Sequence, residues 1–365
     1  MNRRIQRKGK PRTGRSRRVT ALDVATALGL STMTISRALN RRPNVDEETR
    51  ALVLKTARRL GYSPNDIAKS LALNKTNIIG VVLPEISHSF FPEAIRGIEE
   101  VTYEAGYHLI LTHSAEVALR ERDAIQTLES KRVDGILIST AQDISDFQLY
   151  EHLMKVGVPV VFFDRCIRGI GATCVSIDDE ESSHAITGHL LDHGYRRIGH
   201  LAGPQKISVG RERLIGFKRA MADRGVPVDE TLIVESGFDE SGGYAAMSLI
   251  LDRPAEERPQ AIVAINDPAA FGAMKAILDR GLRIADDIAV VGFSDDIRAS
   301  LMPVPLTTIR QPAYMLGKLA AERLLAFIDG KSPGPEEIVV KTELVIRKSC
   351  GCGNGRQFPL SGAAL

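Results

Sequence analysis

Several apolar runs that predict β-strands are followed at once by side chains able to bind a small molecule. Carboxylates, an amide, arginines and aromatic rings suit a polyhydroxylated ligand, because each hydroxyl needs a donor and an acceptor and sugar rings stack on aromatic faces. The candidate ligand-binding residues are Phe90, Phe91, Asp164, Arg165, Arg213, Phe238, Asn266, Asp267, Ser294 and Asp295. For any one of them, a polar cap at a strand end or an ion pair is an equally good interpretation.

A second set of polar side chains lies in residues 19–40, which predict two short helices joined by a turn. Thr20 and Asp23 have the spacing of a capping box, and Gly29 permits the positive φ of a tight turn. Ser31 is suited to cap the second helix. Two helices in this arrangement are typical of a helix-turn-helix, which places its second helix in the major groove of DNA.

The apolar residues of this region predict which helix faces pack together. The first helix has an apolar face of Leu22, Val24, Ala25 and Leu28, and the second directs Ile35 and Leu39 inward. A third helix over residues 46–60 is expected to close the core with Leu52, Val53, Ala57 and Leu60. The outward residues are the candidate DNA contacts, namely Thr20, Ser31, Thr32, Met33, Thr34, Ser36, Arg37 and Asn40.

In their order and spacing, these motifs resemble those of the lactose repressor/purine repressor (LacI/GalR) family of bacterial transcription regulators. The resemblance continues through residues 45–50, 60–65, 68–71, 79–82, 291–293 and 306–312, and it spans the chain from about residue 19 to about residue 348. The series is far more specific than any one of its segments.

The resemblance also assigns a role to residues 64–77. This segment is too short to form a stable helix alone in water, and a plain linker is the alternative interpretation. The resemblance implies a hinge helix that forms on DNA, pairs with its copy in a homodimer and inserts Leu71 into the minor groove. Asn65 and Ala68 are further candidate DNA contacts in this segment.

From residue 77 onward, predicted strands alternate with amphipathic helices, which indicates parallel sheets covered on both faces. The expected strands are 78–83, 107–112, 135–139, 158–163, 198–202, 261–265 and 288–292, with 306–311 as a late crossover to the first lobe. We therefore predict an all-α helix-turn-helix head and an α/β core of two lobes with doubly wound parallel sheets. The resemblance implies that this core has a periplasmic-binding-protein-like fold.

The expected segments follow from these patterns. They are a basic disordered arm (1–18), a helix-turn-helix domain (19–63), a hinge (64–77), a two-lobed ligand-binding and dimerisation core (78–348) and a flexible tail (349–365).

Within the core, the resemblance implies ligand contacts most directly at Phe91, Asp164, Arg213, Phe238 and Asn266. Relatives place an acid directly after the glycine–aromatic pair at 292–293, where this chain has Ser294 and then Asp295. A sugar-hydroxyl contact there therefore depends on Asp295. Ile207 stands where a purine-binding relative offers an arginine, which favours a sugar or sugar derivative as the effector.

Composition and charge narrow the classes of function. The chain has 365 residues, 44% of them hydrophobic and 25% charged, which is typical of a globular protein of two or three domains. No apolar run is long enough to span a bilayer. Residues 1–18 contain nine basic and no acidic residues, although the net charge of the chain is only +3, so the polyanion-binding part is confined to the N-terminal fifth.

Motifs for catalysis or for a metal are weak. No nucleophile elbow or phosphate-binding glycine loop is present, so neither an enzyme nor a cofactor is expected.

His189 and His193 have a spacing that can bind a metal, but we interpret them as part of a surface helix. Cys350 and Cys352 make half a zinc site and are interpreted as incidental. The spacing of the four cysteines demands no disulfide framework, which favours a reduced, cytoplasmic protein.

Together, these patterns predict a ligand-responsive transcription regulator that represses by binding a pseudo-palindromic DNA operator as a homodimer. A small sugar-like effector is expected to control it, and no membrane contact is expected. The first alternative is a sugar-binding protein of a transport system, which would need a signal peptide in place of the basic N-terminus. An enzyme with the same two-lobed fold is the second alternative.

Overall fold

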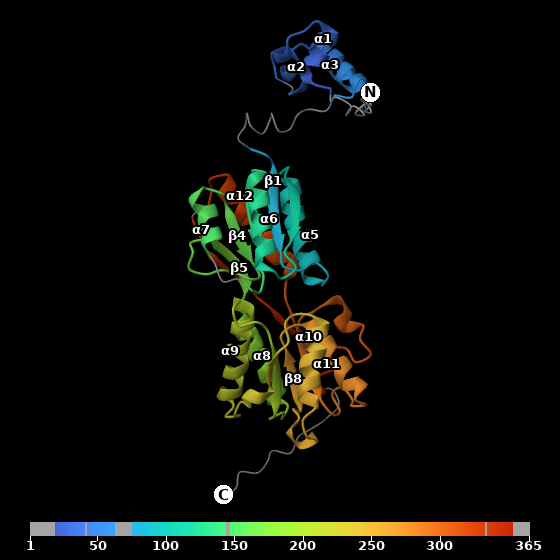
Figure 1. The fold of residues 1–365 in the computed structure, drawn as a ribbon, viewed down its shortest axis with the longest axis vertical. Helices are drawn as coiled ribbons and strands as arrows, with labels where there is room; N and C mark the ends of the chain where they lie inside the picture. The colour runs from blue at the N-terminus through green and yellow to red at the C-terminus, as the bar shows by residue number, and fades with distance from the viewer. Residues whose placement is uncertain (1–18, 41, 63–74, 144–146, 333, 353–365) are drawn as a thin grey trace, which may run out of the picture. The chain divides into compact units, whose positions relative to one another are not determined.

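The computed structural model describes residues 19–40, 42–62, 75–143, 147–332 and 334–352. The chain divides into two compact units, one up to Thr76 and one from Asn77 onward (Figure 1). The basic arm (1–18), most of the expected tail and the candidate DNA contacts Asn65, Ala68 and Leu71 lie outside the described residues. Within the described part of the chain, no helix is long and apolar enough to cross a membrane.

The N-terminal unit, called the head here, contains α1 (Ala21–Leu28), α2 (Thr32–Leu39) and α3 (Glu47–Leu60). The expected caps are confirmed. Thr20 and Asp23 form a capping box, Gly29 ends α1 with a φ of 66°, and the Ser31 hydroxyl accepts a hydrogen bond from the Thr34 amide. These caps stabilise helices that are too short to persist alone.

Two leucines assigned to the core of the head are exposed instead, since Leu22 is 59% and Leu52 is 50% accessible. A short helix packed on two others buries one stripe of positions i, i+3, i+4 and i+7. In α1 this stripe is Ala21, Val24, Ala25 and Leu28, and in α3 it is Val53, Thr56, Ala57 and Leu60. Leu22 and Leu52 fall outside these stripes, so the assignment of both to the core was wrong.

The first lobe of the second unit is built on a six-stranded, wholly parallel sheet. The strands, in the order in which they lie side by side, are β11 (Glu337–Val340), β5 (Thr173–Ile177), β4 (Val160–Phe163), β3 (Gly135–Ile138), β1 (Ile78–Leu83) and β2 (His108–His113). The helices of this lobe are α5 (Phe90–Glu104), α6 (Ala118–Ser130), α7 (Gln148–Lys155) and α12 (Ala313–Ile328). Strands β3, β4 and β5 are fully buried, as expected for a parallel sheet covered on both faces.

The second lobe repeats this plan, except that its last strand is antiparallel. Its strands are, in spatial order, β12 (Glu343–Val345), β10 (Thr307–Arg310), β9 (Ala289–Ser294), β8 (Ala261–Ala264), β6 (Ile198–Ala202) and β7 (Ile233–Glu235). Its helices are α8 (Asp179–Asp192), α9 (Ser208–Asp223), α10 (Glu240–Leu251) and α11 (Asp267–Asp279), with short 3-10 turns at Glu230–Leu232, Ala255–Glu257 and Ile297–Ser300.

The chain passes between the lobes after β5, after β10 and after β11. The expectation that residues 306–311 form the crossover was wrong, because Thr307–Arg310 pairs with β9 as a strand of the second sheet. The crossing follows it, before α12 packs against α5 in the first lobe. That packing requires glycine on both helices, since a Cβ on Gly97 would lie 2.1 Å from the Tyr314 carbonyl oxygen. A Cβ on Gly317 would likewise lie 2.0 Å from the Ala94 carbonyl oxygen.

Cys166 and Cys174 form a disulfide, with their Cα atoms 5.8 Å apart. The sequence was interpreted as that of a fully reduced protein, so this pairing is a correction. The loop after β4 folds back beside β5, the adjacent strand, and brings the two cysteines together. Spacing alone could not reveal this neighbourhood, because it depends on the order of strands in the sheet.

Candidate DNA-binding helix and ligand pocket

In the head, one face of α2 is buried and the other carries the candidate DNA contacts. Ile35 and Ala38 are buried, whereas the expected outward residues Thr32, Met33, Ser36 and Arg37 are exposed. The Arg37 side chain forms no hydrogen bond or ion pair with another described residue of the head. Its guanidinium therefore keeps the donor geometry that can bind two acceptors of a guanine edge at once.

The other candidate DNA contacts in the head have structural roles of their own. Thr20 donates to the Asp23 carboxylate across 2.7 Å, and the Ser31 and Thr34 hydroxyls lie 2.9 Å apart. The Asn40 amide donates to the Ser36 carbonyl oxygen at the end of α2 across 2.9 Å. These four residues fix the ends of the helices and leave the exposed face of α2 free to contact a partner.

In the unit from Asn77 onward, called the core unit, the carboxyl ends of strands from both sheets border a cleft that is partly open to solvent. Such a position is usual for ligands of parallel sheets. The expected ligand residues that line it are Phe90, Phe91, Asp164, Arg165, Arg213, Phe238, Asn266 and Ser294. The structure therefore brings these eight residues together, although the first, Phe90, and the last, Ser294, are far apart in the sequence.

Arg213, on α9, is the most tightly held charged residue of the pocket. It is buried, and its Nε donates to Asp179 across 2.7 Å while an Nη donates to the Ile265 carbonyl oxygen across 2.5 Å. Its guanidinium carbon also lies 3.5 Å from the centre of the Phe293 ring. Burial raises the pKa of Asp179 to about 6, although Arg213 acts in the opposite direction. Arg213 is thus fixed before any ligand arrives.

Arg165 connects the two lobes across the pocket. It donates to Glu116 of the first lobe across 2.7 Å, and its guanidinium lies 4.3 Å from the ring centre of Phe238 in the second lobe. A cation placed over an aromatic face is attracted by the ring. This contact therefore stabilises the present separation of the lobes.

Asp164 is held by its backbone and its neighbours at the end of β4. Its φ is +61°, a conformation uncommon outside glycine and asparagine-like residues, and the Ser139 hydroxyl donates to its carboxylate across 3.2 Å. Burial raises the pKa of Asp164, while Arg165 and Arg213 oppose this change. A carboxylate that is mostly shielded from water and has spare acceptor capacity can bind a ligand hydroxyl.

Asn266 supports the pocket wall as well as bordering it. Its side-chain oxygen accepts from the Ala269 amide across 2.9 Å and caps α11. Its side-chain nitrogen donates to the Phe238 carbonyl oxygen across 2.8 Å. The amide thus ties the loop that carries Phe238 to the start of α11.

Asp267 and Asp295, also expected to bind the ligand, do not line the pocket. Asp267 is buried and accepts hydrogen bonds from the Thr308 hydroxyl and the Asp296 amide. Asp295 pairs with Arg310 and Arg347 across 2.7 and 2.6 Å. The neighbouring Asp296 lines the pocket in place of Asp295. A sequence pattern locates the strand end but does not decide which of three consecutive side chains faces the cleft.

The pocket also contains residues that the sequence analysis did not select. They are Glu85, His88, Glu116, Gln142, Val209, Gly237, Asp239, Pro268, Asp296 and Gln311. Four of them, His88, Glu116, Gln142 and Asp239, lie more than two positions after a strand end, where a pattern limited to the first residues after each strand does not reach. Ile207, which was compared with an arginine of purine-binding relatives, is buried and does not line the pocket.

Two further sequence interpretations need correction. His189 is only 9% exposed, so the assignment of this histidine to a surface helix was wrong. Ser349 and Cys350, placed in a flexible tail, are fully buried. Ser349 donates to the Val290 carbonyl oxygen across 2.6 Å and accepts from the Thr307 amide across 2.8 Å. The second lobe therefore includes Ser349 and Cys350, because β9 and β10 hold this segment.

Comparison with known proteins adds independent findings. Residues 20–65 match the model described as bacterial regulatory proteins, lacI family, and residues 187–350 match a periplasmic binding protein-like domain. The chain is 36% identical over 331 residues to the HTH-type transcriptional repressor PurR of Photobacterium profundum, covering 90% of this chain and 98% of the relative.

Two solved structures show similar folds over most of the chain. The lac repressor dimer bound to operator and the anti-inducer ONPF is 27% identical, with a TM-score of 0.79, covering 92% of this chain and 99% of that chain. The complex of the transcriptional regulator CelR with cellobiose is 29% identical, with a TM-score of 0.70, covering 91% of this chain and 100% of that chain.

Proposed function

The chain belongs to the LacI family of bacterial regulatory proteins, and we propose that it is a repressor whose head reads a DNA operator while its core senses an uncharged, sugar-like effector. The pocket between the lobes carries this proposal, because hydrogen-bonding groups and aromatic rings from both lobes face one cleft. The protein acts in the cytoplasm as a homodimer, and its two heads bind the two halves of a pseudo-palindromic operator.

The charges of the pocket favour an uncharged effector. Five carboxylates border the cleft, namely Glu85, Glu116, Asp164, Asp239 and Asp296, against two arginines, Arg165 and Arg213. Both arginines are already engaged, Arg213 with Asp179 and Arg165 with Glu116. A phosphorylated ligand would add negative charge to a cleft in which carboxylates outnumber arginines, whereas a neutral sugar can use the carboxylates as acceptors. The similar structure of CelR in complex with cellobiose is consistent with this class of ligand.

Effector binding acts on DNA affinity by changing how the lobes are arranged. Asp164 and Phe91 belong to the first lobe, and Arg213 and Phe238 belong to the second. A ligand that contacts both sides favours one separation of the lobes over another, and only such a difference in affinity can shift the equilibrium. In a dimer this shift alters the spacing of the two heads on the operator.

DNA recognition is assigned to α2 and to the segment that follows the head. Thr32, Met33, Ser36 and Arg37 contact base edges or phosphates, and Leu71 enters the minor groove at a central base step. Leu71→Ala is expected to reduce the bend of the DNA, measured by the gel mobility of circularly permuted operator fragments. An unchanged bend would mean that this segment only tethers the head to the core.

A ligand screen with a DNA readout tests the proposed function. The full chain is heated with neutral mono- and disaccharides, sugar phosphates, nucleosides and purine bases, and a true effector at about 100 times its Kd adds about 2.7 kcal/mol of stability. We expect a neutral sugar to raise the melting temperature and to change operator affinity. Stabilisation by a purine or a sugar phosphate alone would refute the proposed effector class. Operator binding that no stabilising ligand changes would refute effector control.

A further inference from the structure

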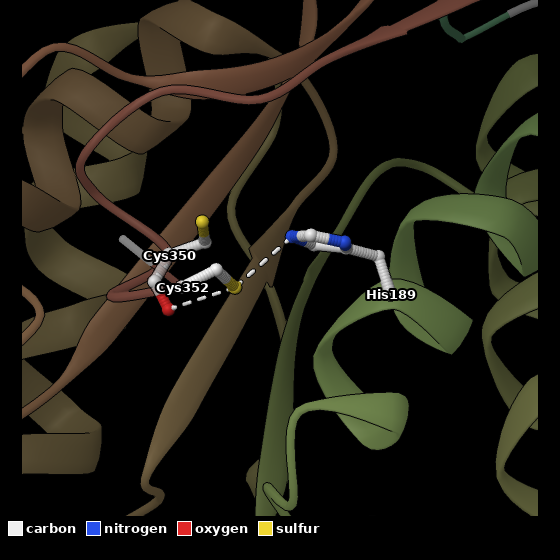
Figure 2. Close-up of side chains that lie close together, drawn as sticks. All are labelled: His189, Cys350 and Cys352. Carbon is white, nitrogen blue, oxygen red and sulfur yellow. Dashed lines mark hydrogen bonds between the residues drawn. The ribbon is translucent and has the colours of Figure 1, made fainter. Parts of the chain in front are cut away.

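Three potential metal ligands converge in the second lobe, away from the residues that line the ligand pocket. Figure 2 shows His189 at the end of α8 facing Cys350 and Cys352 from the chain end that follows β12. The Cys352 sulfur lies 3.2 Å from the His189 Nε2 atom, and all three ligand atoms lie within 4.8 Å of one another. We propose that these side chains bind a Zn²⁺ ion, with water as the fourth ligand.

The distances between the ligand atoms are close to those of a zinc site. With Zn–S bonds of about 2.3 Å and Zn–N bonds of about 2.0–2.1 Å, the ligand atoms of a tetrahedral site are about 3.5–3.8 Å apart. The sulfur–nitrogen distance of 3.2 Å is slightly shorter, and because all three ligand atoms lie within 4.8 Å of one another, no separation is more than about an ångström longer. A difference of this size is smaller than the movement of a cysteine sulfur between two staggered rotamers.

The segment that carries the cysteines is already held in place. The Lys348 and Ser349 amides both donate to the Pro305 carbonyl oxygen across 3.0 Å. The Tyr195 hydroxyl donates to the Cys350 carbonyl oxygen across 2.8 Å. Because β10 and its neighbours fix this segment, bringing the thiols to His189 costs little conformational entropy.

Gly351 makes the close approach of the two cysteines to α8 possible. Its φ is +75°, and a Cβ at this position would lie 2.8 Å from the Tyr195 hydroxyl oxygen. Any other residue here would be strained by its backbone and would meet that side chain. The turn therefore returns the chain toward His189, so that the second thiol comes within reach of the imidazole.

The chemistry of the three groups selects the ion. Two thiolates balance the charge of a divalent cation, which matters here because Cys350 is fully buried and His189 is nearly so. Thiolate and imidazole are ligands that zinc prefers, whereas magnesium and calcium prefer oxygen. Three protein ligands leave one coordination position open, and water occupies it.

A bound ion would connect two elements that are distant in the sequence. His189 lies in the last turn of α8, and the first turn of the same helix carries Asp179, the partner of Arg213 in the pocket. Zinc would join this helix to the segment that carries Cys350 and Cys352 and would thereby stabilise the second lobe. Since the ion binds only the folded site, its effect should appear as a rise in melting temperature.

Metal analysis of the full chain tests the site directly. The protein is purified under reducing conditions, stripped with a chelator and supplied with Zn²⁺ or Co²⁺ in separate experiments. We expect uptake of about one ion per chain, measured by mass spectrometry of the metal. Co²⁺ should produce the thiolate charge-transfer band and the intense visible bands of a tetrahedral site. Failure of the reduced, stripped protein to take up either ion would overturn the proposal.

Matched variants locate the ion. Cys352→Ser and His189→Gln should abolish the cobalt spectrum and the zinc-dependent rise in melting temperature. His184→Gln, on the same helix, and the double variant Cys166→Ser/Cys174→Ser should keep both. Cys352 is partly exposed, so its replacement tests the site with little risk to folding. Equal uptake by Cys352→Ser, His189→Gln and the controls would show adventitious binding and refute the site.

Discussion

Arg37 in the head and Arg213 in the core unit differ in their burial and in their interactions with the rest of the protein. Arg37 is exposed and forms no ion pair with the described residues, whereas Arg213 is 3% exposed and bonded to Asp179 and to the backbone at Ile265. An exposed guanidinium contributes nothing to the fold of the head and is free to bind DNA. A buried one contributes both to the fold and to the shape of the pocket.

This difference extends to the two regions as a whole. The head has a small apolar core whose buried members run from Val24 to Ala57, and its polar side chains mainly cap helices. The core unit buries several carboxylates, among them Glu121, Asp179 and Asp267. We therefore expect substitutions on the exposed face of α2 to change DNA binding without unfolding, and substitutions around the pocket to change stability and ligand response together.

The largest effect is expected from Arg213→Ala, because it leaves the Asp179 carboxylate buried without its partner. Loss of one member of a buried ion pair typically costs about 3–5 kcal/mol. Denaturant unfolding should show this loss, and the folded fraction should bind operator normally but fail to respond to the effector. Asp179→Asn combined with Arg213→Gln should recover part of the stability. A single variant as stable as the wild type would show that the pair does not hold the pocket.

The next effect is a pH dependence of stability that arises from a buried carboxylate of the core unit. Burial raises the pKa of Glu121 to about 7 from 4.5, while the Tyr150 hydroxyl and the Ala141 amide, which donate to it, oppose this change. Between these values the folded state holds a proton on Glu121 that the unfolded state has released, so the contribution of Glu121 to stability falls as the pH rises from about 4.5 to about 7. Buried His200, whose pKa is lowered to about 4 by burial, acts in the opposite direction.

Glu121→Gln should reduce this dependence by about 3 kcal/mol, since a tenfold change in proton affinity is about 1.4 kcal/mol. The measurement is the free energy of unfolding in denaturant at several pH values. Asp267 titrates in the same sense, because burial raises its pKa to about 7, so part of the slope should remain in the variant. An identical slope in the variant and the wild type would remove Glu121 as its source.

A smaller effect is expected from Arg37→Ala, which should lower operator affinity more than affinity for random DNA. Loss of a bidentate bond to guanine costs about 1–3 kcal/mol of discrimination. Arg59→Ala, at an exposed arginine in the last turn of α3, is the matched control and should weaken both affinities equally. Titration of labelled operator and of random duplexes gives both constants. An equal loss for Arg37→Ala would make it a phosphate contact only.

The smallest effect is expected from Thr20→Ala, which removes the cap of α1. Such a cap contributes about 1 kcal/mol. Thermal unfolding of the full chain should show a lower stability of the head, while affinity for random DNA at low salt stays close to that of the wild type. A strong loss of DNA binding without a change in stability would instead make Thr20 a direct DNA contact.

The regular elements were predictable because they depend on local patterns. The caps at Thr20 and Ser31, the helices they begin and the buried strands β1 and β6 were all expected, and the comparisons confirm the family and the two-lobed fold. Strands β5, β7, β11 and β12 were not expected. Most are short or half-exposed, so their apolar runs are weak, and β11 and β12 depend on partners distant in the sequence.

The sequence by itself determined a helix-turn-helix and a series of polar strand ends, since a capping residue, a turn glycine and an apolar run each act over a few neighbouring positions. Only the tertiary structure decided which side chains meet. It turned Asp295 away from the pocket toward Arg310 and Arg347, and it paired Cys166 with Cys174. It also brought Cys352 to His189 from 163 positions away. Such contacts follow from the order of strands and the packing of helices, which no short stretch of sequence contains.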